Sequence, residues 1–261
     1  MFRSVKDIQG YKILAEDGEL GKVAEFYFDD ELWLIRYLVV ETGSWLLERK
    51  VLIAPVALKQ PNDEARTFPV KLTTEQVKNS PDIEADQPVS RQHEMALHEH
   101  YAWPYIDRLG GGLFQEENFG MRSDPVVEMI RANEQSVNKM NGEPAPEKQA
   151  YDPHLQSSKE IIGYHIHAHD GKIGHVEDFI LNDDTWAIRY MIVDTGSWLP
   201  GRKVLISPFW INDIEWAGSI AHVDLIQEAI KNSPEYDPSA PIQRDYENEL
   251  FDHYDWPKYW L

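Results

Sequence analysis

Three histidines separated by single residues are the clearest candidates for chemistry in this chain. Alternate residues of a strand point to the same side, so His165, His167 and His169 would share one face of a sheet. Clustered imidazoles are ligands that zinc and other transition metals use. However, the similar segment that begins at Gly10 has no histidine at the three equivalent positions. We therefore expect a solvated or partly packed histidine face and keep the three residues as secondary metal candidates.

No other pattern in the sequence predicts a catalytic or cofactor site. Asp29 and Asp30 would need more oxygen ligands at fixed spacings to form a calcium loop, and a hairpin turn already accounts for them. His100 recurs as His253 within the same His-Tyr-x-Trp-Pro motif, which favours a structural contact. The chain has no Cys and no G-x-S-x-G motif, so thiol chemistry and a nucleophile elbow are excluded. We expect a protein without enzymatic activity and without a cofactor.

Two arginines each interrupt an apolar run of strand-forming residues. Arg36 and Arg189 stand between isoleucine and tyrosine in equivalent positions. A charged side chain inside a sheet is costly unless it is paired or exposed. We therefore expect each guanidinium to form a salt bridge with a nearby carboxylate.

A Gly-Ser-Trp-Leu sequence predicts two loops that could contact a partner. Trp45 and Trp198 stand in these loops, and Arg49 and Arg202 follow them. Trp and Arg are favoured anchors of protein interfaces, so these four residues are the candidate contact surface. Alternatively, each Trp covers the hydrophobic core of its own domain, and the sequence does not separate these two interpretations.

The elements that carry these residues occur twice. The segment that begins at Gly10 repeats from Gly163, at an offset of 153 residues and without a gap. The similarity extends to a His-Tyr-x-Trp-Pro motif at 100–104 and 253–257. Such internal similarity over about 100 residues indicates two small domains. We expect a first repeat at 1–106, a linker rich in Gly, Asn, Gln, Glu and Pro at 107–158, and a second repeat at 159–261.

Each copy begins with patterns that are typical of strands. Residues 11–16 precede Asp17-Gly18, a hairpin turn signal, and residues 33–40 are rich in aromatic and β-branched types. A further strand is expected over 49–53 until Pro55 ends it. Several short strands with frequent turns predict a small antiparallel barrel or sandwich.

Helices are expected toward the end of each copy, and a short helix is also expected near 124–132 in the linker. Thr73-x-x-Gln76 predicts a capping box for a short helix, whereas Asp224-x-x-Gln227 of the second copy does not stand at the equivalent positions. A longer helix is expected in each tail, because apolar and aromatic residues recur there every four positions. The stripes consist of Val89, His93, Leu97 and Tyr101, and of Ile242, Tyr246, Leu250 and Tyr254.

Three shared motifs resemble the PRC-barrel family over about residues 8–81 and 161–234. They are Asp-Gly at 17–18 and 170–171, Ile-Arg-Tyr at 35–37 and 188–190, and Arg-Lys-Val at 49–51 and 202–204. The resemblance implies two tandem small antiparallel PRC-like β-barrels, each with a short helix and a C-terminal helical tail. It also implies a role in protein contacts, with no enzymatic chemistry common to the family.

Composition narrows the classes of partner. The 45 acidic and 25 basic side chains give a net charge of -20, which disfavours nucleic acid, since phosphate binding draws on clustered Lys and Arg. No apolar run is long enough to cross a bilayer, and the N-terminus lacks the apolar region of a signal peptide. We expect a cytoplasmic protein without an integral membrane segment.

The sequence thus predicts a protein-interaction or scaffold module with an unidentified protein partner. The two repeats are expected to pack on each other or to mediate homo-oligomers. Two alternatives remain. The first, suggested by the protein for which the family is named, is a membrane-associated, photosynthetic reaction centre H-like assembly protein. The second is a stress protein that binds a ligand or a metal through the histidines.

Overall fold

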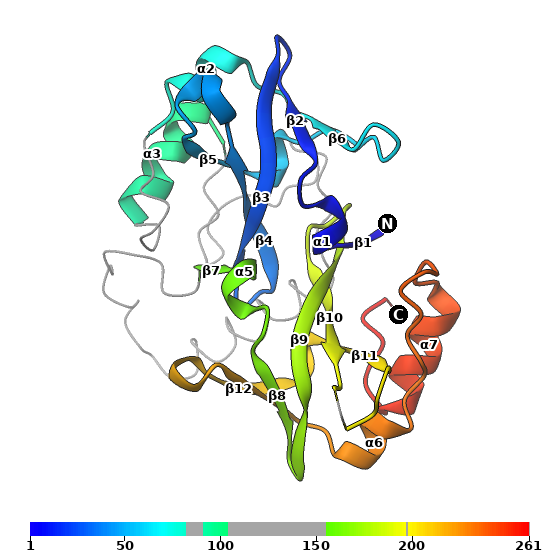
Figure 1. Cartoon of the computed structure of the whole chain (residues 1–261). Helices are drawn as coiled ribbons and strands as arrows, with labels where there is room; N and C mark the ends of the chain where they lie inside the picture. The colour runs from blue at the N-terminus through cyan, green and yellow to red at the C-terminus, as the bar shows by residue number, and fades with distance from the viewer. Residues whose placement is uncertain (82–90, 104–154, 197, 261) are drawn as a thin grey trace. The chain divides into compact units, whose positions relative to one another are not determined.

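The structure is a computed structural model that describes residues 1–81, 91–103, 155–196 and 198–260. The chain divides into two compact units. Ile8–Ser157 form the first-copy unit, and Met1–Asp7 together with Ser158–Leu261 form the second-copy unit. Each unit contains one sheet and a few short helices (Figure 1). The expected mainly β fold is confirmed.

The first-copy unit contains a six-stranded sheet in the order β5-β4-β3-β2-β6, with β7 also paired to β3. Its elements are β2 (Lys12–Leu14), β3 (Glu19–Asp29), β4 (Leu34–Glu41), β5 (Lys50–Ile53), β6 (Thr67–Pro69), α2 (Thr74–Lys78), α3 (Arg91–Tyr101) and β7 (Leu155–Ser157). Short 3-10 turns lie at Gly43–Leu46 and Pro55–Ala57. Its core includes the fully buried side chains of Ile13, Leu20, Phe26, Phe28, Leu38, Ile53 and Phe68.

The second-copy unit contains a seven-stranded sheet in the order β11-β10-β9-β8-β13-β12, with β1 also paired to β9. Its elements are β1 (Phe2–Ser4), α5 (Ser158–Ile161), β8 (His165–Ala168), β9 (Gly171–Asn182), β10 (Ile188–Asp194), β11 (Lys203–Ile206), β12 (Ile211–Glu215), β13 (Ile220–Val223), α6 (Gln227–Lys231) and α7 (Arg244–His253). Turns of 3-10 type lie at Pro208–Trp210 and Trp216–Gly218, and α1 (Val5–Ile8) leads from this unit into the other.

Both sheets follow one plan, which is antiparallel except at one pair of strands in each. β2 pairs with β6, and β8 pairs with β13, in parallel. In the described part of the chain no ladder joins β5 to β6 or β11 to β12, so neither sheet is observed as a closed barrel. Proline stands at or just after several strand ends, since Pro69 ends β6 and Pro55 and Pro208 follow β5 and β11. A proline has no N–H with which to extend a ladder.

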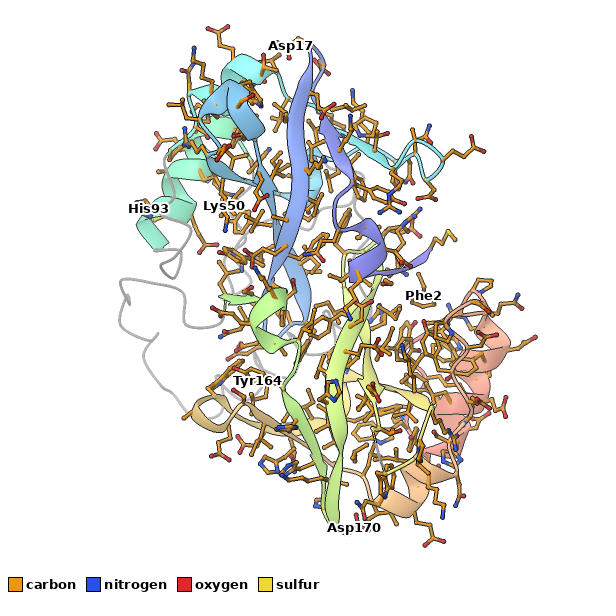
Figure 2. The ribbon with its side chains drawn as sticks, in the orientation of Figure 1. Phe2, Asp17, Lys50, His93, Tyr164 and Asp170 are labelled. Atoms are coloured by element: carbon orange, nitrogen blue, oxygen red, sulfur yellow. The ribbon has the colours of Figure 1, made fainter. Side chains whose placement is uncertain are left out.

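The Asp-Gly hairpins also position the short helices. Asp17 accepts a hydrogen bond from the Thr74 amide at 2.7 Å, and Asp170 accepts one from the Gln227 amide at 2.8 Å. Each carboxylate therefore satisfies a free N–H at the start of α2 or α6. Figure 2 labels both aspartates at the hairpin tips. The predicted capping box of Thr73 and Gln76 is confirmed.

The most consequential feature is that the two copies exchange their first strands. β1 is the first strand of the first copy, yet it pairs antiparallel with β9 in the second-copy unit (Figure 1). β7 precedes the second copy and pairs antiparallel with β3 in the first-copy unit. The registers correspond, since Ser4 pairs with Ile180 and Ser157 pairs with Tyr27 at the same offset of 153 residues. Each unit is therefore completed by a strand from the other copy.

Serine residues anchor both exchanged strands. The Ser4 hydroxyl donates to Asp178, which also accepts a hydrogen bond from the Lys6 amide at 3.2 Å. The Ser157 hydroxyl donates to Glu25 at 2.5 Å. Both carboxylates are buried on the strand that receives the exchanged segment. Hydrogen bonds to a buried charge are stronger than neutral ones, so these contacts stabilise the pairing of both exchanged strands.

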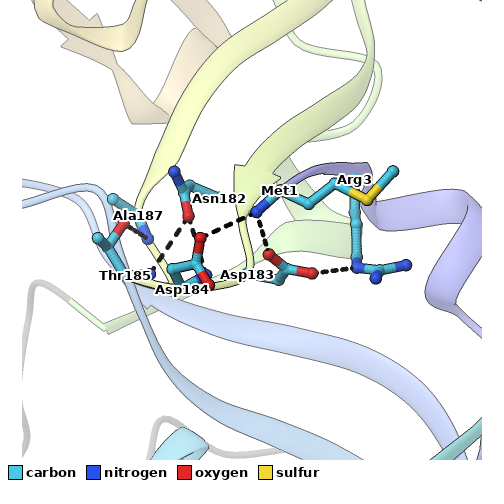
Figure 3. Close-up of polar contacts among 7 residues, drawn as sticks. All are labelled: Met1, Arg3, Asn182, Asp183, Asp184, Thr185 and Ala187. Atoms are coloured by element: carbon cyan, nitrogen blue, oxygen red, sulfur yellow. Dashed lines mark hydrogen bonds and ion pairs between the residues drawn. The ribbon is translucent and has the colours of Figure 1, made fainter. Parts of the chain in front are cut away.

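A second pair of equivalent contacts lies at the neighbouring turn. Arg3 Nε donates to Asp183 Oδ2 at 2.5 Å, and the Met1 amino group bonds Asp183 and Asp184 (Figure 3). In the other unit Gln156 Nε2 donates to Asp30 Oδ2 at 3.1 Å. Both exchanged strands are thus held at two corresponding points.

Each tail helix is fixed to its sheet through a β-bulge. The register passes from Ile35 to Tyr37 and from Ile188 to Tyr190, so the intervening Arg36 and Arg189 are the extra residues of two bulges. A bulge re-aims the side chain that it contains. Both guanidinium groups are consequently buried, together with the tyrosine that follows each of them.

In the first-copy unit the bulged arginine forms the expected salt bridges. Arg36 lies 3.5 Å from Asp29 and 3.2 Å from Glu94 of α3. Tyr37 donates to Glu94 at 3.0 Å and contacts His98 Nε2 at 2.8 Å. The helix is therefore held by a buried, charged network.

In the second-copy unit Glu247 stands at the position equivalent to Glu94 but has different partners. Tyr190 and Tyr259 both donate to Glu247 of α7 at 2.7 Å, and Arg244 lies 2.8 Å from it. The Arg189 guanidinium stacks on the Tyr259 ring at 4.1 Å. For Arg189 the structure shows a cation–π contact with Tyr259, and the expected salt bridge stays a prediction.

The expected tail helices are present as α3 and α7, but the buried stripe of α3 is shifted. Glu94, Leu97, His98 and Tyr101 are buried, whereas His93 is exposed on the outer side of the helix (Figure 2). The buried positions follow the i, i+3, i+4, i+7 spacing of a helix face. The four-residue repeat in the sequence was an incomplete guide, because the polar Glu94 and His98 face the sheet to bond Tyr37.

The expected division into 1–106, 107–158 and 159–261 stays a prediction. Most of the proposed linker, including the short helix expected near 124–132, lies outside the described residues. The structure adds that residues 155–157 form β7 and that residues 1–7 belong to the second-copy unit.

Strand exchange predicts that cutting the chain between the copies will not release them. A protease site inserted between Gly142 and Glu143 would give two fragments, each of which supplies one strand to the other unit. We expect the cleaved fragments to co-elute in native size-exclusion chromatography and to separate in denaturant. The control carries Arg3→Pro and Gln156→Pro, which disrupt β1 and β7 equally and should allow separation. Folded wild-type fragments that separate at once would contradict the exchange.

A pH dependence follows from Asp178 beneath the exchanged strand β1. Burial raises the pKa of Asp178 above its usual 3.8, although hydrogen bonds from Ser4, Phe179 and Lys6 oppose the shift. The folded state therefore binds this proton more tightly than the unfolded state. This contribution to the free energy of unfolding falls as pH rises from 3.8 through the raised pKa and is constant above it.

Asp178→Asn removes this titration, so the stability of the wild type relative to the variant should fall with rising pH across that window. Urea unfolding followed by Trp fluorescence at a series of pH values measures the difference. Ser4→Ala removes a bond that lowers the pKa, so it should extend the fall to higher pH. A difference that is independent of pH would disprove the assignment.

Candidate functional site

The loop between β4 and β5 presents the most exposed apolar side chain among the described residues. It begins with the 3-10 turn Gly43–Leu46 and continues through Leu47 and Glu48. Leu47 is 93% exposed and Trp45 is 40% exposed. Two of the large apolar side chains that reach the described surface therefore stand two residues apart on one loop.

The loop backbone is strained at its tip. Leu47 and Glu48 have φ values of 55° and 59°, in the left-handed region that side chains with a Cβ rarely adopt. The Leu47 amide bonds the Gly43 carbonyl, and the Glu48 amide bonds the same oxygen at 2.7 Å. These bonds keep the tip in its conformation and hold Leu47 away from the core.

Trp45 is oriented by one hydrogen bond. Its indole N–H donates to the Leu20 carbonyl at 2.7 Å. The polar edge of the ring is thereby satisfied by the protein, while part of the apolar face remains open to solvent. This geometry combines the two interpretations from the sequence, because the ring covers β3 and is also accessible.

Arg49 and Arg202 each link the loop that precedes them to the C-terminal end of the short helix through hydrogen bonds. Arg49 donates to the carbonyls of Ser80 at 2.7 Å and Pro81 at 2.6 Å, just beyond the end of α2. Arg202 donates to the Lys231 carbonyl at 2.5 Å and also to the Ser233 carbonyl. A guanidinium bonded to carbonyls at a helix C-terminus satisfies acceptors that the helix leaves free. These two arginines therefore position the loop.

The corresponding loop of the second copy presents a different surface. Trp198 is only partly exposed, and Pro200 and Gly201 replace Leu47 and Glu48. Gly201 takes the left-handed conformation, with φ of 77°, without a side chain. The strained, apolar tip is therefore a property of the first copy alone.

Two of the three alternating histidines lie on one face of β8, and a histidine from another strand joins them. His165 and His167 alternate with the buried Ile166 and Ala168. His222 of β13 is the register partner of His167, and their ring centres are 5.6 Å apart. His169 follows the strand and bonds Asp224 at 2.6 Å. His222 thus takes the place in the cluster that the sequence suggested for His169.

The environment of His167 favours the neutral imidazole. Burial lowers the pKa of His167, and nearby basic groups, with Lys172 the largest contributor, lower it further. In the described part of the chain no three His, Cys, Asp or Glu side chains are arranged as a ready metal site.

The sequence missed Leu47 and His222 for different reasons. Leu47 lacks a counterpart in the second copy, and its exposure depends on a backbone conformation that leucine seldom adopts. His222 stands 55 residues beyond His167, and only the parallel pairing of β8 with β13 brings them together. A weak signal was present for Leu47, since Pro-Gly in the second copy marks a turn at the same place.

Comparison with known proteins finds a family match in the first copy. The PRC-barrel domain model matches residues 1–77. No curated protein matches the chain significantly. The matched segment includes the Gly-Ser-Trp-Leu loop, and PRC-barrel domains often mediate protein interactions. No helix in the described residues has the length and apolar character needed to span a bilayer.

Relief of backbone strain gives a test of the loop geometry. Glu48→Gly introduces the residue that the second copy has at this position, and we expect it to raise the free energy of unfolding by about 0.5 to 1 kcal/mol, since the left-handed penalty exceeds the entropic cost of glycine. The reverse change, Gly201→Glu, should destabilise the protein, although a Cβ there would meet no atom within 4 Å. Urea unfolding measures both variants. A destabilised Glu48→Gly protein would contradict the left-handed conformation of Glu48.

Proposed function

We propose that this protein is a non-enzymatic protein-interaction module built from two PRC-type domains. The family match to residues 1–77 supports the assignment for the first copy. The gapless repeat at an offset of 153 residues supports extending it to the second, as does the equivalent strand order of the two sheets. The proposed role is binding, with a protein as the partner.

We further propose that the tip of the loop in the first-copy unit, formed by Trp45 and Leu47, is the contact surface. The observation that carries this proposal is the 93% exposure of Leu47 on a strained backbone. Strain at a sparsely populated conformation persists where the surroundings enforce it, and it is concentrated at functional sites. Here Arg49 and the carbonyl of Gly43 enforce it.

The energetics favour a small apolar anchor. Burying a leucine side chain that is now exposed contributes about 1.5 to 3 kcal/mol to association. The loop is already ordered by its own hydrogen bonds, so little conformational entropy is lost on binding. Trp45 adds a large ring whose polar edge is already bonded, and aromatic residues of this kind are common at the centre of interfaces.

Leu47→Ser tests the contact surface without disturbing the core. A substitution at an exposed position should change the free energy of unfolding by less than about 0.5 kcal/mol. We expect crosslinking and affinity capture from the source cell to recover the partner with wild-type protein, and at least tenfold less of it with the variant.

The matched control is Ile226→Ser in the second-copy unit. Ile226 is also aliphatic and is 48% exposed, and it stands at the start of α6, where serine is well tolerated. Capture should be unchanged in this control. Equal capture by wild type and Leu47→Ser would refute the contact surface.

A further inference from the structure

The outer face of the second-copy sheet carries a histidine pair that the proposed contact surface does not use. His167 of β8 is in register with His222 of β13, and His222 is in register with Asp213 of β12. Register partners on neighbouring strands present their side chains on the same face of a sheet. The three side chains therefore form a row across three strands, opposite the buried Ile166 and Ala221.

The spacing of the two imidazoles matches that of ligands on one metal ion. Zinc–imidazole bonds of about 2.0 Å place each ring centre about 3.2 Å from the ion, so two rings at the tetrahedral angle have centres about 5.2 Å apart. The observed ring centres are 5.6 Å apart, and the ring planes are nearly perpendicular at 86°.

The surroundings leave a ligand position open. The pair lines a hollow of about 540 Å³ together with His169, Asn212 and Asp213. The Nε2 atom of His167 is buried and has no hydrogen-bond partner among the described residues. A buried ring nitrogen without a partner is costly, and a metal bond would satisfy it.

We propose that His167 and His222 bind one divalent transition-metal ion, such as Zn²⁺ or Ni²⁺, with Asp213 as the adjacent carboxylate and water in the remaining positions. Imidazole is a preferred ligand of these ions, and a carboxylate adds negative charge beside the cation. Because no three ligands are already assembled among the described residues, the affinity will be lower than that of a structural zinc site.

The first copy provides an internal comparison. Leu14 and Pro69 occupy the positions that correspond to His167 and His222, so that sheet cannot bind a metal in the same way. The proposal therefore requires one ion per chain. It is independent of the contact loop, which lies in the other unit.

Isothermal titration of Zn²⁺ and of Ni²⁺ into untagged, chelator-treated full-length protein tests the site. We expect saturable binding of one ion per chain. His167→Leu introduces the residue of the first copy, and this variant and His222→Gln should each weaken binding at least tenfold. The control His169→Gln removes a histidine from the same hollow but outside the pair, and it should bind as the wild type does.

Folding of each variant is verified by its circular dichroism spectrum, so that loss of binding is not confused with unfolding. Thermal unfolding gives a second readout, since an ion that binds only the native state raises the Tm of the wild type. This rise should vanish in the double variant of His167 and His222. Absence of saturable binding below 1 mM, or equal binding by the folded double variant, would overturn the proposal.

Discussion

The architecture of both units depends on the burial of an arginine at a β-bulge. Arg36 and Arg189 are each inserted into the longest hairpin of their sheet and are almost completely removed from water. A buried guanidinium is tolerated only when its surroundings compensate for its lost hydration. The helical tail of each copy supplies that compensation, through Glu94 of α3 in one case and through Tyr259, which follows α7, in the other. The tails are therefore required parts of the domains.

The two solutions to this constraint show how the copies have diverged. In the first-copy unit one arginine lies between two carboxylates, those of Asp29 and Glu94. In the second, Asn182 stands in place of Asp29, and Arg244 is the charged partner of Glu247. The cation on the helix is not itself new, since Arg91 of the first copy stands at the position equivalent to Arg244. The tyrosine-to-glutamate hydrogen bond is common to both units and preserves the position of the helix.

Local features of the fold could be predicted from the sequence, whereas long-range ones could not. The Asp-Gly turns, the capping box of Thr73 and the salt bridge of Arg36 depend on short-range patterns or on the cost of burying charge. Strand exchange depends on a choice between two similar partner strands, which the three residues of β1 do not encode by themselves. The bulges and the parallel pair that joins His167 to His222 likewise depend on register. Comparison of the copies singled out Arg49 as a shared candidate contact residue, and the structure shows that it supports the loop, whereas the exposed tip at Leu47 arises where the copies differ.

Strand exchange also constrains the order in which the protein can be completed during synthesis. The ribosome makes β1 first, yet its partner residues on β9 are made only after more than two thirds of the chain. The sheet of the first-copy unit similarly waits for Leu155–Ser157, long after its other strands have been produced. Until then β3 retains an unpaired edge, and such edges are prone to incorrect pairing. Neither domain can complete its sheet before synthesis of the other copy has begun. The nascent first domain therefore keeps an unpaired strand edge until the strand from the other copy pairs with it.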